Sequence, residues 1–376
     1  MKAILLMLCL ALTSIVTGQQ TINGSIIHDA IQRDYILYVP SSYTPGTPAP
    51  LVLNFHGYTS NSSEQMFYGD FRPIADTAGF LLVHPMGTLD GSNEPYWNSG
   101  WGGTVDDIGF TEALIDSLAA NYTVDLDRVY STGMSNGGFM SYTLACELSH
   151  RIAAIASVTG TMNTNQNLTC NPQHPMPVME IHGTSDGVVP YLGNVNMAST
   201  ASVLNYWVNT NVCDVVPVET AVPDINITDG CTATHFIYSN GNNGVDVEHY
   251  RINGGSHTWP GAPFAIAGTN YDIDASEKIW IFFSQYDING KIVAELSEES
   301  ALNIQLYPNP AEHTVTIAGL NDYSVDQLVI TSIEGNVVKT IKHPTEQIKI
   351  EDLESGVYFI GFKVGVHEQI IRLVKK

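Results

Sequence analysis

The sequence predicts an α/β fold, with a mostly parallel sheet and helices on both of its faces, followed by a small all-β sandwich. Three observations predict it. Short apolar strands alternate with helical segments from residue 51 to residue 181, an order typical of a parallel sheet. Short alternating strands separated by turn residues fill the last 75 or so positions, as in a β-sandwich. A length of 376 residues leaves room for two domains.

The first 18 residues are predicted to be a secretory signal peptide. Lys2 is followed by the apolar run 3–12 and then by small and polar residues, which is the order of such a signal. No other apolar run approaches the 18 or so residues that span a bilayer, so we expect the exported chain to have no stable membrane insertion. We expect a secreted, extracellular or cell-surface protein.

Residues 19–287 are predicted to form the α/β domain. Its first strands, at 22–27 and 33–39, look like an antiparallel pair, and residues 51–55 read as a buried strand. A helix over 64–78 and a strand over 80–85 follow, and then a long loop over 86–103. Asp106 and Asp107 are read as caps of a helix over 108–121 rather than as an acid/base or calcium pair.

The turn around Ser135 has the pattern of a nucleophile elbow. Gly133-Met134-Ser135-Asn136-Gly137 lies between a strand at 128–132 and a helix at 139–150. A sharp strand-to-helix turn needs glycine two positions on either side of the nucleophile, where a Cβ would clash. The helix that begins there supplies main-chain N–H groups for an oxyanion. Ser135 is therefore the candidate nucleophile.

An acid and a histidine follow Ser135 at the ends of later strands. Asp186 follows a strand that starts at residue 177, and His257 follows a strand over 247–252. The order Ser135, Asp186, His257 is that of α/β-hydrolases, in which the histidine carries the proton of the serine and the acid orients the imidazole. The main-chain N–H groups of Tyr58 and Asn136 are the candidate oxyanion hole.

Aromatic residues near these turns are candidates for substrate binding. Trp97 and Trp101 lie in the loop 86–103, and long loops in compact domains are usually functional. They could line a substrate cleft or cover the core. Trp259 lies two residues after His257 and is the third candidate.

Cysteine count and charge limit the remaining options. Outside the signal segment the chain has Cys146, Cys170, Cys213 and Cys231, and an even count in an exported chain indicates two disulfides. The pairs 146–170 and 213–231 are favoured because each closes a short loop. There is no C-x-x-C pair and the histidines lack ligand spacing, so no metal site is predicted. A net charge of −23 makes nucleic-acid binding an unfavoured function.

Residues 288–301 are predicted to be an acidic linker, and residues 302–376 to be the β-sandwich. Strands are expected at 314–317, 327–331, 337–341, 357–364 and 369–374. A carbohydrate-binding or adhesive module is one reading of such a sandwich.

The α/β domain resembles a known family in several motifs, among them Gly133-Met134-Ser135-Asn136-Gly137-Gly138, His182-Gly183-Thr184-x-Asp186-x-Val188-Val189-Pro190-Tyr191, and Gly254-Gly255-x-His257-Thr258-Trp259-Pro260-Gly261. They are similar to those of secreted polyhydroxybutyrate depolymerases and feruloyl esterases, which are α/β-hydrolases. The resemblance implies a serine esterase without a cofactor. It would act through an acyl-enzyme on feruloyl or acetyl esters of plant polysaccharide, or on a polyhydroxyalkanoate-type polyester.

The last domain resembles the C-terminal sorting domain of the type IX secretion system. The resemblance rests on Leu306-Tyr307-Pro308-Asn309-Pro310-Ala311 and on Leu353-x-Ser355-Gly356-Val357-Tyr358. It implies a partner in the secretion machinery. Two other functions are compatible with the sequence as a whole. One is a secreted serine peptidase, and the other is a catalytically silent polysaccharide-binding protein on the same fold.

Overall fold

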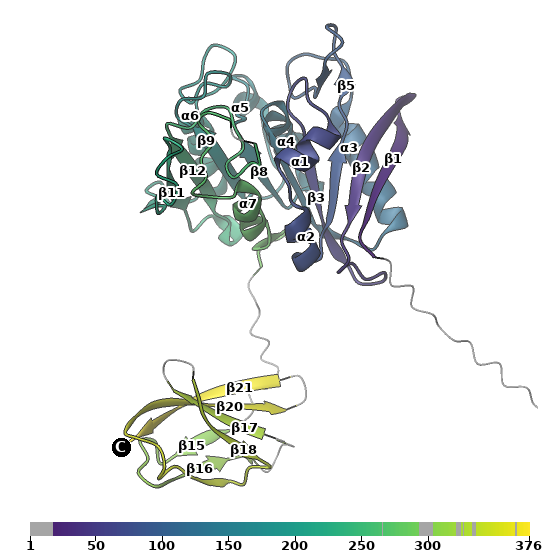
Figure 1. The fold of residues 1–376 in the computed structure, drawn as a ribbon. Helices are drawn as coiled ribbons and strands as arrows, with labels where there is room; N and C mark the ends of the chain where they lie inside the picture. The colour runs from purple at the N-terminus through teal and green to yellow at the C-terminus, as the bar shows by residue number, and fades with distance from the viewer. Residues whose placement is uncertain are drawn as a thin grey trace, which may run out of the picture. The chain divides into compact units, whose positions relative to one another are not determined.

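The computed structural model describes residues 18–264, 266–292, 304–320, 325, 327–332, 336–364 and 367–376 (Figure 1). The predicted signal segment, apart from Gly18, and residues 293–301 of the predicted linker lie outside the described residues. The chain divides into two compact units, Met1–Ile292 and Val293–Lys376.

The first unit is built on one ten-stranded sheet with the strand order β1-β2-β4-β3-β7-β8-β9-β12-β11-β10. Its central strands, from β4 to β12, pair in parallel, whereas the strands at both edges pair in antiparallel fashion. The antiparallel edges arise because β1–β2 is a hairpin and β10, β11 and β12 follow one another as a meander. The strands are β1 Gln20–His28, β2 Ile31–Val39, β3 Ala49–Phe55, β4 Leu81–Pro85, β7 Val124–Met134, β8 Ala154–Val158, β9 Val178–Gly183, β10 Val218–Ala221, β11 Thr232–Tyr238 and β12 Val247–Asn253.

Helices cover both faces of this sheet, and the predicted α/β fold class is confirmed (Figure 1). Successive residues of β3 show how the faces are filled, because Leu51 and Leu53 pack into one core cluster and Val52 into the other. Side chains of α3, α4 and α6 contribute to the first cluster, and side chains of α2 and α7 to the second. The helices are α1 Ser62–Tyr68, α2 Arg72–Ala78, α3 Asp107–Asn121, α4 Asn136–Glu147, α5 Gln166–Thr169, α6 Thr200–Asn211 and α7 Ala275–Phe283.

The single helix predicted over 64–78 is wrong, because the chain breaks there into α1 and α2. Gly69 ends α1 and lies so close to Trp259 that a Cβ at this position would be 2.9 Å from the indole ring. The Gly69 carbonyl accepts a hydrogen bond from the buried Asn54 amide (3.0 Å), so it is withdrawn from helix pairing. Pro73 then stands in the first turn of α2, where a missing N–H costs least.

The first unit continues past residue 287, where the predicted linker begins. β13 (Tyr286–Asp287) and β14 (Gly290–Lys291) form a short hairpin. The Lys291 ammonium contacts the Asp246 carboxylate at 2.7 Å, and the Ile288 N–H donates to the Asp127 carbonyl at 2.8 Å. These contacts fasten residues up to Ile292 to the sheet.

One of the two predicted disulfides is present and the other is wrong. Cys146 at the end of α4 is bonded to Cys170, whereas Cys213 and Cys231 are free and buried. Asp214, the residue after Cys213, donates its N–H to the carbonyl of Ser239, which directly follows β11. Cys231 directly precedes β11, so the two cysteines lie near opposite ends of this strand. At about 3.4 Å per residue the two cysteines are about 25 Å apart, far beyond the Cα separation of about 7 Å that a disulfide tolerates.

The second unit is the predicted all-β sandwich. One sheet has the order β15-β16-β19 and the other β18-β17-β20-β21. Val315 and Ile317 of the first sheet share a core with Leu328 and Ile330 of the second. Among the described residues of the chain, no helix is both long and apolar enough to cross a bilayer. The strands are β15 Gln305–Tyr307, β16 Thr314–Ala318, β17 Gln327–Ser332, β18 Val337–Lys342, β19 Gln347–Lys349, β20 Gly356–Val364 and β21 His367–Lys375.

Candidate active site

Ser135 lies between β7 and α4 in a backbone conformation that side chains rarely adopt. Its φ is 54° and its ψ is −119°. The Ser135 N–H donates to the Val158 carbonyl (2.9 Å), and the Ser135 carbonyl accepts from the Phe139 N–H (3.0 Å), so the strained residue is held from both sides. A Cβ at Gly133 would be 2.5 Å from the Phe55 carbonyl oxygen, which is why glycine is needed there.

Asp186 and His257 are brought together by the loops that follow β9 and β12. The His257 Nδ1–H donates to Asp186 Oδ2 at 2.7 Å, since a carboxylate can only accept. Asp186 Oδ1 accepts from the main-chain N–H groups of Val188 (2.8 Å) and Val189 (2.9 Å). In the neutral imidazole this arrangement leaves Nε2 without a proton, which is the state required of a base.

The charge of Asp186 is stabilised by its hydrogen bonds. Burial would raise the pKa of Asp186, but the neighbouring imidazoles of His182 and His257 outweigh burial and hold the pKa well below its usual range. The two loops are also joined directly, because the Ser185 N–H donates to the Gly255 carbonyl at 2.9 Å. Asp186 is therefore an ionised, firmly placed hydrogen-bond partner for the His257 imidazole.

The two candidate oxyanion-hole residues, Tyr58 and Asn136, belong to segments that adjoin Ser135. Gly57 is close enough that a Cβ there would be 3.5 Å from the Ser135 Cβ, and Tyr58 is the next residue. Asn136 is the first residue of α4, so its N–H is one of the helix-start amides without a partner inside the helix. The Asn136 side chain is engaged elsewhere, because its amide oxygen accepts the Trp97 N–H at 2.6 Å.

The structure corrects two of the three tryptophans predicted to bind substrate. Trp97 is completely buried and donates from its indole N–H to the His56 carbonyl (3.0 Å). Trp259 is 1% exposed and donates to the Ser276 hydroxyl (3.2 Å). Both are core residues. Trp101 is 43% exposed and packs edge-on against Phe139, so substrate contact there stays a prediction.

The two adjacent aspartates before α3 have separate roles. Asp106 caps the helix by accepting the Gly109 N–H at 2.8 Å, as predicted for it. Asp107 is not a cap. It forms a buried ion pair with Arg33 (2.5 Å) and accepts the Asn98 N–H (2.7 Å), which fastens the loop 86–103. That loop also contains a short hairpin of β5 (Thr88–Leu89) and β6 (Pro95–Tyr96).

Sequence reasoning missed a buried ionic pair behind Asp186. His182 Nδ1 contacts Glu180 Oε1 at 2.7 Å, and His182 Nε2 lies 3.5 Å from Asp186 Oδ2. The Tyr142 hydroxyl donates to the other Glu180 oxygen at 2.6 Å. The signal was available, because two ionisable residues two positions apart in an apolar strand point to the same face of the sheet.

Among the described residues, one group of three side chains could hold a metal ion. His28, Asp29 and Asp106 place their ligand atoms within 4.8 Å of one another. They lie at the turn between β1 and β2 and at the start of α3. Since Asp106 already caps α3, the group has a structural role without any ion.

Two segments of the chain match known families. Residues 103–239 match the Phospholipase/Carboxylesterase family, and residues 305–376 match the secretion system C-terminal sorting domain. An acetyl xylan esterase from Aspergillus awamori has a solved structure that shares the fold. It superposes with a TM-score of 0.51 at 14% identity, over 70% of this chain and 99% of that chain.

Curated relatives include esterases of fungi. The chain is 27% identical over 275 residues to a bifunctional acetylxylan esterase/xylanase of Neocallimastix patriciarum, covering 73% of this chain and 36% of that protein. It is 28% identical over 240 residues to feruloyl esterase B of Piromyces equi (60% and 42%) and 25% identical over 275 residues to feruloyl esterase D of Neurospora crassa (71% and 86%). The chain thus spans less than half the length of the first two relatives and most of the third.

Proposed function

From a carboxylesterase segment in an α/β-hydrolase fold and a secretion sorting domain on the same chain, we propose a secreted serine esterase. Its substrates are acyl esters of plant polysaccharide, of the feruloyl or acetyl kind. The observation that carries the proposal is the 2.7 Å hydrogen bond between His257 and Asp186, on loops that follow neighbouring strands, together with the strained turn at Ser135. The names of the relatives favour polysaccharide esters over a polyhydroxyalkanoate polyester.

Each residue has one role in the proposed acylation step. The Ser135 Oγ attacks the ester carbonyl carbon while His257 Nε2 takes the hydroxyl proton. The N–H groups of Tyr58 and Asn136 stabilise the oxyanion of the tetrahedral intermediate, a contribution of about 3–4 kcal/mol for one such donor. When the intermediate collapses, the C–O bond to the alcohol breaks and His257 returns the proton to the leaving oxygen. The products are the free alcohol and an acyl ester of Ser135.

Deacylation repeats these roles with water as the nucleophile. His257 takes a proton from water, the resulting hydroxide attacks the acyl carbon, and the same N–H groups hold the second oxyanion. Collapse releases the carboxylic acid and restores the Ser135 hydroxyl with the proton held by His257. In both steps Asp186 keeps the imidazole in the tautomer with Nδ1–H and stabilises its charged form.

The sorting domain gives the proposed function its location. We propose that residues 305–376 direct export through the type IX secretion machinery, so that the enzyme reaches polysaccharide outside the cell. The polysaccharide-linked ester and the export machinery are then the two partners of the chain.

The proposal is tested on the full chain with methyl ferulate, acetylated xylan, a polyhydroxybutyrate film and a peptide amide. We expect hydrolysis of the first two, and a turnover that falls as pH is lowered because the base must be neutral. Asp186→Asn should lower kcat by about 10⁴-fold through the wrong imidazole tautomer, and Ser135→Ala by at least as much. A fluorophosphonate should label wild type and leave Ser135→Ala unlabelled.

Three results would contradict the proposal. Near-wild-type turnover in Asp186→Asn would show that this residue does not orient the base. Faster cleavage of the peptide amide than of the esters would make the chain a peptidase. No labelling of wild type by the fluorophosphonate, together with no hydrolysis, would leave a catalytically silent protein.

A further inference from the structure

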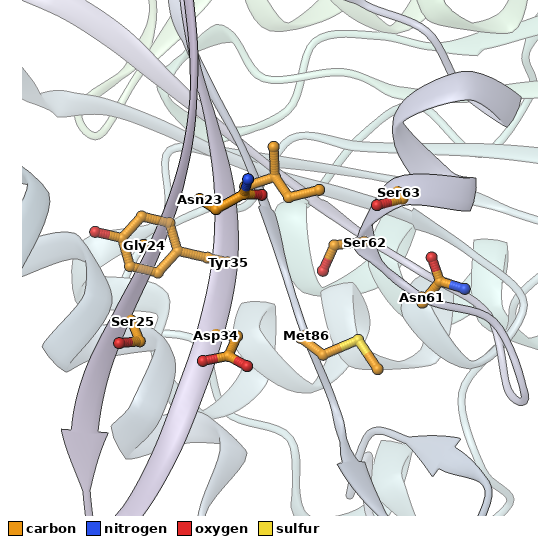
Figure 2. Close-up of a pocket in the computed structure, with 10 residues that line it drawn as sticks. Asn23, Gly24, Ser25, Asp34, Tyr35, Asn61, Ser62, Ser63 and Met86 are labelled. Carbon is orange, nitrogen blue, oxygen red and sulfur yellow. The ribbon is translucent and has the colours of Figure 1, made fainter.

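A polar pocket opens between the β1–β2 hairpin and the start of α1, outside the site of Ser135 (Figure 2). Its volume is about 430 Å³. One wall is formed by one face of the hairpin and the other by the first turn of α1, and the side chains on both walls are short and polar. They are Asn23, Ser25 and Asp34 on the hairpin, and Asn61, Ser62 and Ser63 at the helix.

Ser62 gives a direct reason to expect a ligand in this pocket. The residue is 6% exposed, and its Oγ has no hydrogen-bond partner among the described residues. Burying a hydroxyl without a partner costs about 1–3 kcal/mol. The neighbouring Asn61, by contrast, uses its side-chain oxygen to accept the Glu64 N–H at 3.0 Å. Figure 2 shows the Ser62 hydroxyl directed into the pocket.

The lining favours a neutral ligand rich in hydroxyl groups. Of the residues that line the pocket Asp34 alone is charged, and none is Lys or Arg, so an anion would be repelled. Gln32 donates to one Asp34 oxygen at 2.8 Å, which leaves the other oxygen to accept from a ligand. Ile36 and Met86 add an apolar strip to this wall. Hydroxyl partners beside an apolar strip match the two kinds of surface on a sugar ring.

The pocket and Ser135 lie at the same edge of the sheet. Tyr35 pairs with Pro85 at the end of β4, so the pocket is at the carboxyl ends of the parallel strands, where Ser135 follows β7. Three strand spacings, from β2 through β4 and β3 to β7, separate them laterally by about 14 Å. A single ester group cannot occupy both places, whereas a polymer can.

We propose that this pocket is a saccharide-binding subsite, which holds a neutral sugar unit of the polysaccharide while an ester on the same chain is hydrolysed at Ser135. The proposal rests on the proposed function for its substrate, but binding at the pocket requires no ester chemistry.

Two variants and one control test the subsite in the full chain. Ser62→Ala removes the unpartnered hydroxyl, and Asp34→Ala removes the carboxylate. Ser202→Ala is the matched control. Like Ser62, Ser202 lies in the first turn of a helix, but it is exposed and belongs to α6, which does not line the pocket. Calorimetric titration with ester-free xylohexaose measures binding. Kinetics on acetylated xylan and on methyl ferulate separate polymer recognition from chemistry.

We expect each variant to weaken xylohexaose binding and to lower kcat/KM on acetylated xylan about 5-fold, the effect of one lost hydrogen bond. On methyl ferulate kcat/KM should stay within about 2-fold of wild type, and Ser202→Ala should change nothing. Ser62→Ala should also melt no lower than wild type, because it removes a hydroxyl that has no partner.

Several outcomes overturn the subsite. The proposed subsite is refuted if the wild type does not bind xylohexaose and the variants keep wild-type kinetics on acetylated xylan. An equal loss on methyl ferulate would assign Asp34 and Ser62 a structural role instead. Should wild type hydrolyse neither ester, the proposed function fails, and the calorimetric result still decides whether the pocket binds sugar.

Discussion

Breaking the buried pair of Glu180 and His182 should strongly destabilise the first unit, and His182→Gln tests this. Both side chains are completely buried, and the imidazole and carboxylate are 2.7 Å apart. The substitution leaves the buried Glu180 carboxyl, whose pKa burial raises, without its cationic partner and with the Tyr142 hydroxyl as a hydrogen-bond partner. Removing one member of a buried ion pair costs about 3–5 kcal/mol, against a total of about 5–15 kcal/mol for a typical domain. We therefore expect His182→Gln to lose a large part of the free energy of unfolding.

The pH dependence of this contribution has a definite sign. Burial lowers the pKa of His182, but interactions with the Asp186 and Glu180 carboxylates outweigh burial and raise the pKa to about 10. A raised pKa means that the folded state binds the proton more tightly than the unfolded state, whose value is about 6.5. The stabilisation is thus complete below pH 6.5 or so, and it is lost as pH rises toward about 10. The difference between wild type and His182→Gln should shrink over the same range.

Denaturation in guanidinium chloride, followed by tryptophan fluorescence, measures the effect. All five tryptophans lie before residue 293, so the signal reports on the first unit alone. The double variant Glu180→Gln/His182→Gln is the control, because it removes both charges and should recover much of the loss. The reasoning fails if His182→Gln unfolds within about 1 kcal/mol of wild type at pH 6, since a broken buried pair costs about 3–5 kcal/mol.

Four further outcomes are expected. Ser135→Gly and Ser135→Ala should both be inactive, but the glycine variant should be more stable than the alanine variant by about 1 kcal/mol. Relief of backbone strain, about 1–3 kcal/mol, exceeds the extra conformational entropy that glycine loses on folding. The same denaturation assay measures this difference. Stability should fall as pH drops from about 6.5 toward 4, because burial lowers the pKa of three histidines and the unfolded state then binds more protons than the folded state. Denaturation midpoints of the wild type at pH 7 and at pH 4.5 measure the loss. The three histidines are His56 (pKa about 4), His84 (about 3) and His249 (about 3). Replacing Cys146 and Cys170 by serine should lower the free energy of unfolding by about 3 kcal/mol, because the bond closes a loop between positions 24 apart. A thiol titration of the denatured wild type should find Cys213 and Cys231 but not this pair. A chain truncated after Ile292 should keep wild-type kcat on methyl ferulate; a large loss would mean that the second unit helps to build the site.

The sequence predicted those parts of the molecule that depend on local pattern. The strand–turn–helix around Ser135 follows from glycine spacing, and the strands before Asp186 and His257 follow from short apolar runs. Because the carboxyl ends of parallel strands meet at one edge of the sheet, the structure places Asp186 and His257 within hydrogen-bond distance.

The errors concern contacts between distant segments, which a single sequence does not display. Trp97 and Trp259 occur in glycine-rich turns typical of a cleft wall, yet the indoles pack inward because each N–H finds a buried acceptor. The break at Gly69 arises from the approach of the Trp259 ring, nearly two hundred positions away. A periodic pattern of apolar residues continues through that break and predicts one helix.

The placing of Cys213 and Cys231 at opposite ends of β11 has a consequence for biogenesis. In the unfolded chain the two thiols are near neighbours in sequence, and an oxidising compartment can join them quickly. Such a bond would prevent β11 from extending between them, so the polypeptide could not complete its sheet until thiol–disulfide exchange released it. Pairing of β11 and oxidation of the two thiols therefore compete while the chain folds. Once β11 has formed, its length keeps the two thiols too far apart to bond to each other.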